Sequence, residues 1–113
     1  MITIYHNPRC RKSREGLAIL EQSEQEFEVV KYLEDHLNAN ALKAIISKLG
    51  INPIDLVRKN EAIWKSDFKG KKLSDSELIA AMVNYPKLIE RPIVINNNKA
   101  VVGRPPENIT TII

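Results

Sequence analysis

The sequence contains one cysteine, and its neighbours favour thiol chemistry. Cys10 lies between a short apolar run, Ile2–Tyr5, and a segment with helical spacing. A helix N-terminus stabilises a thiolate or a bound anion through its unpaired N–H groups and its dipole. The same turn also carries four basic side chains, those of Arg9, Arg11, Lys12 and Arg14. Both effects lower a thiol pKa, so Cys10 is a candidate nucleophile. The alternative is a small, buried and unreactive side chain.

The spacing around Cys10 excludes two kinds of cysteine enzyme. A low-molecular-weight phosphatase loop needs an arginine where this chain has Gly16. A thioredoxin-type dithiol needs a second cysteine where this chain has Ser13. A cysteine protease needs a paired histidine, and nothing in the sequence marks a peptide-binding cleft beside His6 or His36. His6 lies in the same turn as Cys10, where it either hydrogen-bonds the thiolate or shapes its loop; the alternative is an ordinary turn histidine.

Three further arginines lie where predicted apolar elements end. Arg58 follows a short apolar helical turn, Arg91 precedes a predicted strand, and Arg104 follows the next strand. The planar guanidinium fork binds a tetrahedral oxyanion in a bidentate manner, and functional side chains are common at such element ends. For each of the three, a surface or salt-bridge role is the ordinary alternative.

The composition predicts one soluble globular domain over residues 1–113, with 43% hydrophobic and 27% charged residues. A net charge of +3 suits an anionic small molecule, and the absence of a dense basic run or an aromatic platform argues against nucleic acid. One cysteine excludes a disulfide framework and a cysteine-rich metal site. The sequence shows no signal peptide and no membrane span, so we expect a cytoplasmic protein without a membrane partner.

The N-terminal periodicity predicts a strand–helix–strand unit. Ile2–Tyr5 is the first strand, a helix runs from about Arg11 to Gln22, and Phe27–Tyr32 is the second strand. Cys10 then lies in the loop between the first strand and the helix. Parallel pairing of the two strands would make this a βαβ unit.

The middle of the chain is predicted to be helical, and two strands and a last helix follow it. The apolar spacing of Leu42–Leu49 predicts a helix, and Ser74–Glu77 matches a capping box before another. The segments 92–95 and 99–102 flank three asparagines, which predicts a β-hairpin, and Pro105-Pro106 opens the last helix. The order βαβ, helices, ββα predicts an α/β fold with a helical insertion between its halves.

Four motifs resemble the ArsC family of glutathione- and glutaredoxin-coupled arsenate reductases. They are Ile4-Tyr-His-Asn-Pro-Arg-Cys10, Leu56-Val-Arg58-Lys-Asn60, Arg91-Pro-Ile-Val94 and Gly103-Arg104-Pro, in this order. The resemblance covers nearly the whole chain and implies a thioredoxin-like fold with a helical insertion. It also implies that Cys10 is the nucleophile and that Arg58, Arg91 and Arg104 bind the oxyanion. His6 matches the family's histidine before the cysteine, and the Arg91–Pro92 bond becomes a candidate cis peptide.

The activity implied by the resemblance is the reduction of arsenate to arsenite. Glutathione would be the co-substrate and glutaredoxin the protein partner that regenerates the Cys10 thiol, with no bound cofactor and no metal. The single cysteine argues against thioredoxin-coupled reductases, which relay electrons through several cysteines of their own. The chain departs from the well-characterised reductases at Arg11 and Lys12, where they tend to have smaller residues.

Two alternatives remain open from the sequence. One is an ArsC-like thiol oxidoreductase that acts on another substrate. The other is a regulator similar to the Spx proteins, which share the fold and dock on RNA polymerase. Against the regulator, this chain has Ser13 where redox-switch members have a second cysteine, and it retains Arg58 and Arg104, which an anion site needs.

Overall fold

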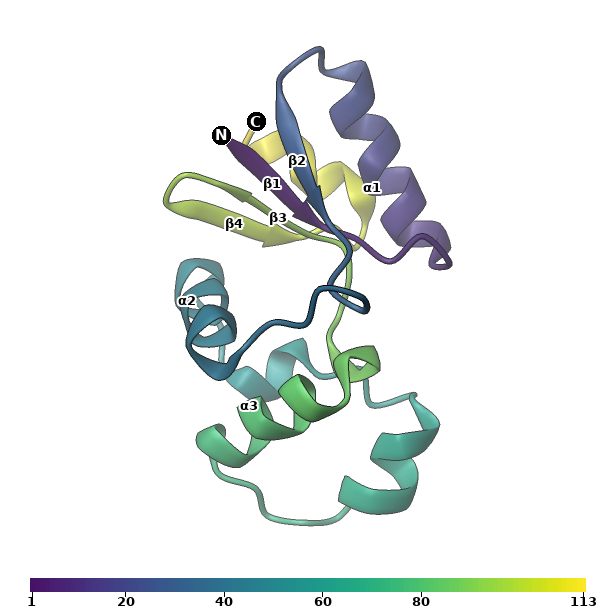
Figure 1. Ribbon diagram of the computed structural model, residues 1–113, viewed down its shortest axis with the longest axis vertical. Coiled ribbons are helices and arrows are strands. Elements are labelled where there is room, and N and C mark those ends of the chain that lie inside the picture. The colour runs from purple at the N-terminus through teal and green to yellow at the C-terminus, as the bar shows by residue number, and fades with distance from the viewer. The chain divides into compact units, whose positions relative to one another are not determined.

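The computed structural model describes residues 1–113, which divide into two compact units. The first unit consists of Met1–Asp35 together with Arg91–Ile113, and the second is His36–Glu90. All four strands belong to the first unit, and the second is helical (Figure 1). The expectation of one domain over the whole chain stays a prediction. None of the helices has both the length and the apolar character needed to cross a membrane.

The first unit is built on a four-stranded sheet with the order β2-β1-β3-β4. The strands are β1 (Ile2–Tyr5), β2 (Phe27–Val30), β3 (Ile93–Asn96) and β4 (Lys99–Val102). β1 pairs in parallel with β2 and antiparallel with β3, and β3 and β4 form a hairpin. Because parallel strands end at the same edge of a sheet, the loops after β1 and β2 begin side by side.

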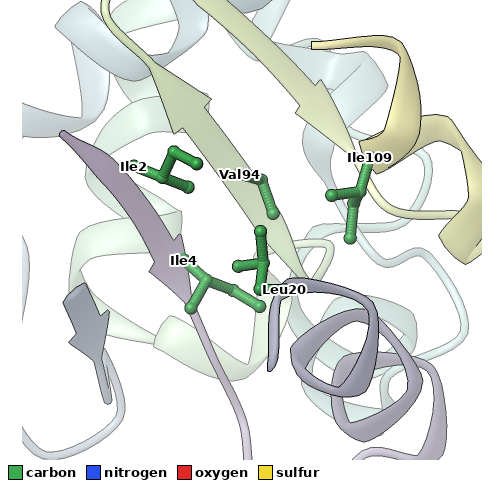
Figure 2. Close-up of a cluster of buried hydrophobic side chains, with 5 residues drawn as sticks. All are labelled: Ile2, Ile4, Leu20, Val94 and Ile109. Atoms are coloured by element: carbon green, nitrogen blue, oxygen red, sulfur yellow. The ribbon is translucent and has the colours of Figure 1, made fainter. Parts of the chain in front are cut away.

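Helix α1 (Arg11–Gln22) and the 3-10 helix η4 (Pro106–Thr111) pack on one face of this sheet. Ile2 and Ile4 from β1, Val94 from β3, Leu20 from α1 and Ile109 from η4 form its buried apolar cluster (Figure 2). Alternate residues of a strand share a face, which is why Ile2 and Ile4 both reach this cluster. Leu20 in this cluster packs α1 against the sheet, and α1 begins directly after Cys10.

Two glycines let the backbone around Pro92 approach α1 closely. A Cβ atom built on Gly16 would lie 2.9 Å from the Pro92 ring, and one on Gly103 would lie 2.8 Å from it. Both positions also face the side chain of Ile109, at 2.9 and 3.1 Å. Real Cβ atoms essentially never show contacts under 3.0 Å, so both glycines are required for the Pro92 ring to lie where it does.

Replacing Gly16 with alanine should destabilise the first unit by about 1–3 kcal/mol, because the added methyl group overpacks this contact. Urea unfolding of Gly16→Ala measures the loss. Ile109→Val removes the Cδ1 atom that would lie 2.9 Å from the added methyl group, so the double variant should lose less than the sum of the two single variants. Strictly additive losses would contradict the packing argument.

The second unit consists of short helices around an apolar core of its own. Its elements are α2 (Ala39–Leu49), η1 (Pro53–Leu56), the π-helix η2 (Trp64–Phe68), α3 (Asp75–Asn84) and η3 (Pro86–Leu88). α3 contacts α2, η1 and η3, and its buried face includes Leu78 and Met82. The predicted capping box before α3 is present, since Ser74 and Glu77 each accept the other's backbone N–H at 3.2 and 3.0 Å.

The βαβ unit, the helical segment and the ββα unit confirm the predicted α/β order, and the fold is thioredoxin-like. In chain order, His36–Glu90 separates β2 from β3. The structure corrects two boundaries. The second strand ends at Val30 rather than Tyr32, and the last helix is a 3-10 helix that begins at Pro106. The π-helix η2 was not anticipated.

Candidate active site

Cys10 lies at the junction between the loop after β1 and the first turn of α1. Its backbone N–H donates to the carbonyl oxygen of Asn7 at 3.0 Å, which closes the loop into a tight turn. Its own carbonyl oxygen accepts the N–H of Arg14 at 3.0 Å, so Cys10 is the N-cap residue of the helix. The thiol is free and partly exposed. This is the position at which the dipole of α1 favours a thiolate.

Two of the three predicted arginines meet the thiol in the first unit. Nη1 of Arg104 lies 3.9 Å from Sγ of Cys10 and donates to the carbonyl oxygen of Arg91 at 2.9 Å. The Gly103 N–H donates to the Pro92 carbonyl at 2.8 Å, which holds the two arginine-bearing segments together. Arg91 is only 8% exposed, whereas Arg104 is exposed. The Arg91–Pro92 bond is cis, as the resemblance implies, and so is Arg104–Pro105.

These surroundings lower the pKa of the Cys10 thiol below its usual value. Burial by itself raises the pKa, because it penalises the charged thiolate. The backbone N–H of Ser13 and the guanidinium groups of Arg91 and Arg104 outweigh burial and lower the pKa. The site therefore favours a nucleophilic thiolate, and its two guanidinium groups also suit an oxyanion that the thiolate attacks.

His6 is buried at the start of the cysteine loop. Its Nδ1 lies 2.6 Å from the hydroxyl oxygen of Ser13, and that oxygen also accepts the backbone N–H of Asn7 at 3.0 Å. Burial lowers the pKa of His6, and the charges of Lys31 and Arg14 lower it further, against the opposing effect of Ser13. At neutral pH the imidazole is therefore uncharged, and it supports the loop through Ser13.

The lowered pKa of His6 makes the stability of the fold pH-dependent. The unfolded chain protonates His6 near its usual pKa and the folded chain only at lower pH, so unfolding takes up a proton as the pH falls. The free energy of unfolding should therefore decrease below about pH 6.5, the usual pKa of histidine. Urea unfolding at pH 5.5 and 7.5 measures this. His6→Asn should flatten the dependence, and the control His36→Asn should retain it; an unchanged slope in His6→Asn would contradict the assignment.

Arg58 lies in the second unit, where its charge is paired within that unit. Its guanidinium group lies 3.5 Å from a carboxylate oxygen of Glu61 and 3.8 Å from one of Glu90. Its backbone N–H donates to the carbonyl oxygen of Leu88 at 2.7 Å. The sequence did not predict that two carboxylates share this arginine.

Arg11 and Lys12, the two basic residues that follow the cysteine, both contact the carboxylate of Glu15. Nε of the exposed Arg11 donates to Glu15 at 3.0 Å, and Nζ of Lys12 lies 3.8 Å from the same carboxylate. One turn of helix thus brings a carboxylate against both charges, and neither residue contributes to the lowered pKa of Cys10. Their charge is partly compensated within the helix.

The model of the ArsC family matches residues 5–112. The chain belongs to the ArsC family. It is 42% identical to an arsenate reductase of Haemophilus influenzae, over 99% of this chain and 98% of the relative. It is 46% identical to the uncharacterized protein YfgD of Escherichia coli, over 99% and 96%. The solved structure of an arsenate reductase from Vibrio cholerae matches with a TM-score of 0.94 and 45% identity, over 99% and 97% of the two chains.

Sequence reasoning missed the part that Ser13 plays in this ArsC-family chain. The sequence indicated only that Ser13 excludes a dithiol, yet Ser13 is completely buried, its hydroxyl bonds His6, and its backbone N–H lowers the pKa of Cys10. Its place three residues after the cysteine was the available clue, because the N–H at that position of a helix faces the N-cap side chain. Gly16 and Gly103 were also missed, since their importance lies in contacts between distant segments.

Proposed function

We propose that this protein reduces arsenate to arsenite, with the Cys10 thiolate as nucleophile. The observation that carries the proposal is the meeting of two guanidinium groups, those of Arg91 and Arg104, at a thiol whose pKa they lower. Relatives named arsenate reductases match nearly the whole chain and support the choice of oxyanion. We propose a cytoplasmic location, because the reaction needs a reduced thiol and a pool of small thiols.

In the first step the thiolate attacks the arsenic atom and an oxygen leaves as water after taking up protons. An S–As bond forms, and arsenic remains As(V) in a Cys10–S–arsenate adduct. Arg91 and Arg104 neutralise the negative charge of the oxyanion and the charge that develops on the departing oxygen. We include Arg58 as a third oxyanion ligand because residues 56–60 match the family motif. His6 acts by holding the cysteine loop through Ser13.

In the second step glutathione supplies the electrons, because the chain has no second cysteine. The glutathione thiolate attacks the Cys10 sulfur, and the S–As bond breaks with its electron pair left on arsenic. As(V) becomes As(III), arsenite leaves, and a Cys10–glutathione disulfide remains. Glutaredoxin then accepts the glutathione by thiol–disulfide exchange and releases the Cys10 thiolate. The proposal requires no bound cofactor and no metal.

Arsenate-dependent oxidation of NADPH tests this function, with glutathione, glutathione reductase and a glutaredoxin supplied. The proposal predicts turnover that stops when arsenate, glutathione or glutaredoxin is left out singly. Turnover with thioredoxin and thioredoxin reductase in their place would contradict the glutathione coupling. A protein that reduces no arsenate while Cys10 still reacts rapidly with alkylating agents at neutral pH would instead be a thiol oxidoreductase for another substrate.

A further inference from the structure

An open cavity of ≈ 370 Å³ lies beside the cysteine loop, and its walls carry charges that the proposed reaction has not used. Six residues of the first unit line it, namely Asn7, Pro8, Arg9, Lys31, Leu33 and Glu34. Three of them come from the loop after β1 and three from the segment after β2. Arg9, which directly precedes Cys10 in the chain, is therefore both a wall of the cavity and a neighbour of the nucleophile.

The topology of the sheet creates this cavity. β1 and β2 are parallel and in register as far as Tyr5 and Val30, and the His6 N–H extends the pairing by donating to the Val30 carbonyl at 2.9 Å. Beyond that point the segments that follow β1 and β2 separate, and the cavity lies between these two segments. The Arg9 N–H donates to Oδ1 of Asn7 at 3.0 Å. This bond holds in place the backbone of the cavity wall that precedes Cys10.

The charges around the cavity are two positive and one negative. Arg9, Lys31 and Glu34 are all exposed, and none of the three takes part in an ion pair of the structure. The Glu34 N–H donates to the Lys31 carbonyl at 2.9 Å, so a single turn carries both side chains. Elsewhere in this chain, arginines such as Arg11 and Arg58 are paired with carboxylates, whereas the cavity presents its charges to solvent.

We propose that this cavity is the glutathione subsite, which rests on the proposed function in that glutathione is the electron donor there. At neutral pH glutathione has two carboxylates and one ammonium group, with its thiol between them. Arg9 and Lys31 match the two carboxylates, and Glu34 matches the ammonium group. Cys10 itself does not line the cavity, but its neighbour Arg9 does, so a tripeptide anchored on Arg9 lies beside the loop that carries the nucleophile. Uncharged thiols of similar reactivity would lack these contacts.

Titration with S-methylglutathione, which cannot exchange disulfides, tests the subsite without arsenate or glutaredoxin. Amide NMR signals of residues 7–9 and 31–34 should shift as the probe binds. Lys31→Gln and Glu34→Gln should each weaken binding about two- to fivefold, the size expected of one exposed ion pair. Lys43→Gln, which removes an exposed lysine from α2 in the second unit, is the matched control and should leave the affinity unchanged.

A second probe assigns the ammonium contact to Glu34. The analogue in which glutaryl replaces the γ-glutamyl group lacks only the ammonium, so it should bind the wild-type protein about as weakly as S-methylglutathione binds Glu34→Gln. Glu34→Gln should then not weaken binding of the analogue further. Equal losses for both probes would show that Glu34 does not contact the ammonium group, and would overturn the assignment.

The outcomes separate this proposal from the proposed function. If S-methylglutathione binds here but the protein reduces no arsenate, the subsite stands and the reductase assignment fails. If the protein reduces arsenate with glutathione but Lys31→Gln and Glu34→Gln change neither binding nor the glutathione KM, the subsite is overturned. It is equally overturned if Lys31→Gln slows only the exchange with glutaredoxin, because the cavity would then contact the protein partner.

Discussion

Cys10→Ser abolishes arsenate-dependent turnover, a loss of about a thousandfold or more, and leaves the fold intact. A serine hydroxyl is not ionised near neutral pH, and it can form neither the S–As bond nor the disulfide with glutathione. The fold should survive because the thiol is partly exposed and Cys10 forms its loop and helix contacts through the backbone. The coupled NADPH assay measures the activity, and thermal unfolding checks the fold.

A thiol placed elsewhere supplies the matched control for this variant. Ser76 is exposed on α3, in the second unit, so Ser76→Cys in the Cys10→Ser background restores the thiol count without restoring its environment. No recovery of turnover is expected, because the activated thiolate depends on the N-terminus of α1 and on Arg91 and Arg104. Turnover by Cys10→Ser at the wild-type rate would rule out the proposed nucleophile.

Arg91→Ala lowers kcat/KM for arsenate by about a hundredfold and raises the pKa of Cys10. Arg91 is 8% exposed, so its charge acts on the thiolate with little screening by solvent. Its removal takes away a stabiliser of the thiolate, and the rate of alkylation at neutral pH should therefore fall. The pH profile of Cys10 alkylation by iodoacetamide should shift towards higher pH. A merely structural role for Arg91 would not move this profile.

Arg91→Lys shows whether the effect of Arg91 depends on the planar guanidinium fork or only on the positive charge. Arg11→Ala is the matched control. Lysine keeps the charge but loses the planar fork, so Arg91→Lys should retain much of the lowered thiol pKa and still raise the arsenate KM. Arg11 directly follows Cys10 in sequence but does not contribute to its lowered pKa, so Arg11→Ala should leave the profile unchanged. An unchanged profile and KM in Arg91→Ala would contradict the site.

The local elements were predictable because local patterns determine them. The strand Ile2–Tyr5 and the helix Arg11–Gln22 have the predicted bounds, and the Ser74–Glu77 capping box forms as its spacing requires. The hairpin turns at Asn97, whose φ of 57° is one that asparagine tolerates. The π-helix Trp64–Phe68 was not predictable in this way, since its i to i+5 pattern has no distinct apolar period.

The candidate site was predictable in its residue types but not in its contacts. The helix N-terminus and the basic turn indicated a reactive Cys10, and the family motif indicated Arg91 and Arg104. That the Ser13 hydroxyl would bond both His6 and the Asn7 N–H depends on the loop after β1 folding back onto α1, which no local pattern encodes. The burial of Arg91 likewise depends on packing between segments far apart in the chain. The roles of His6 and Arg58 in catalysis stay predictions.

The measurement that tests the central claim most directly is mass spectrometry of the protein after reaction without glutaredoxin. The account predicts that arsenate and glutathione together add one glutathione to Cys10, in an amount equal to the arsenite released. Glutathione alone should leave the thiol free, because forming the disulfide needs an oxidant and arsenate is that oxidant. Arsenite released in a single turnover with Cys10 unmodified would contradict the account, because the electrons would then have bypassed the cysteine.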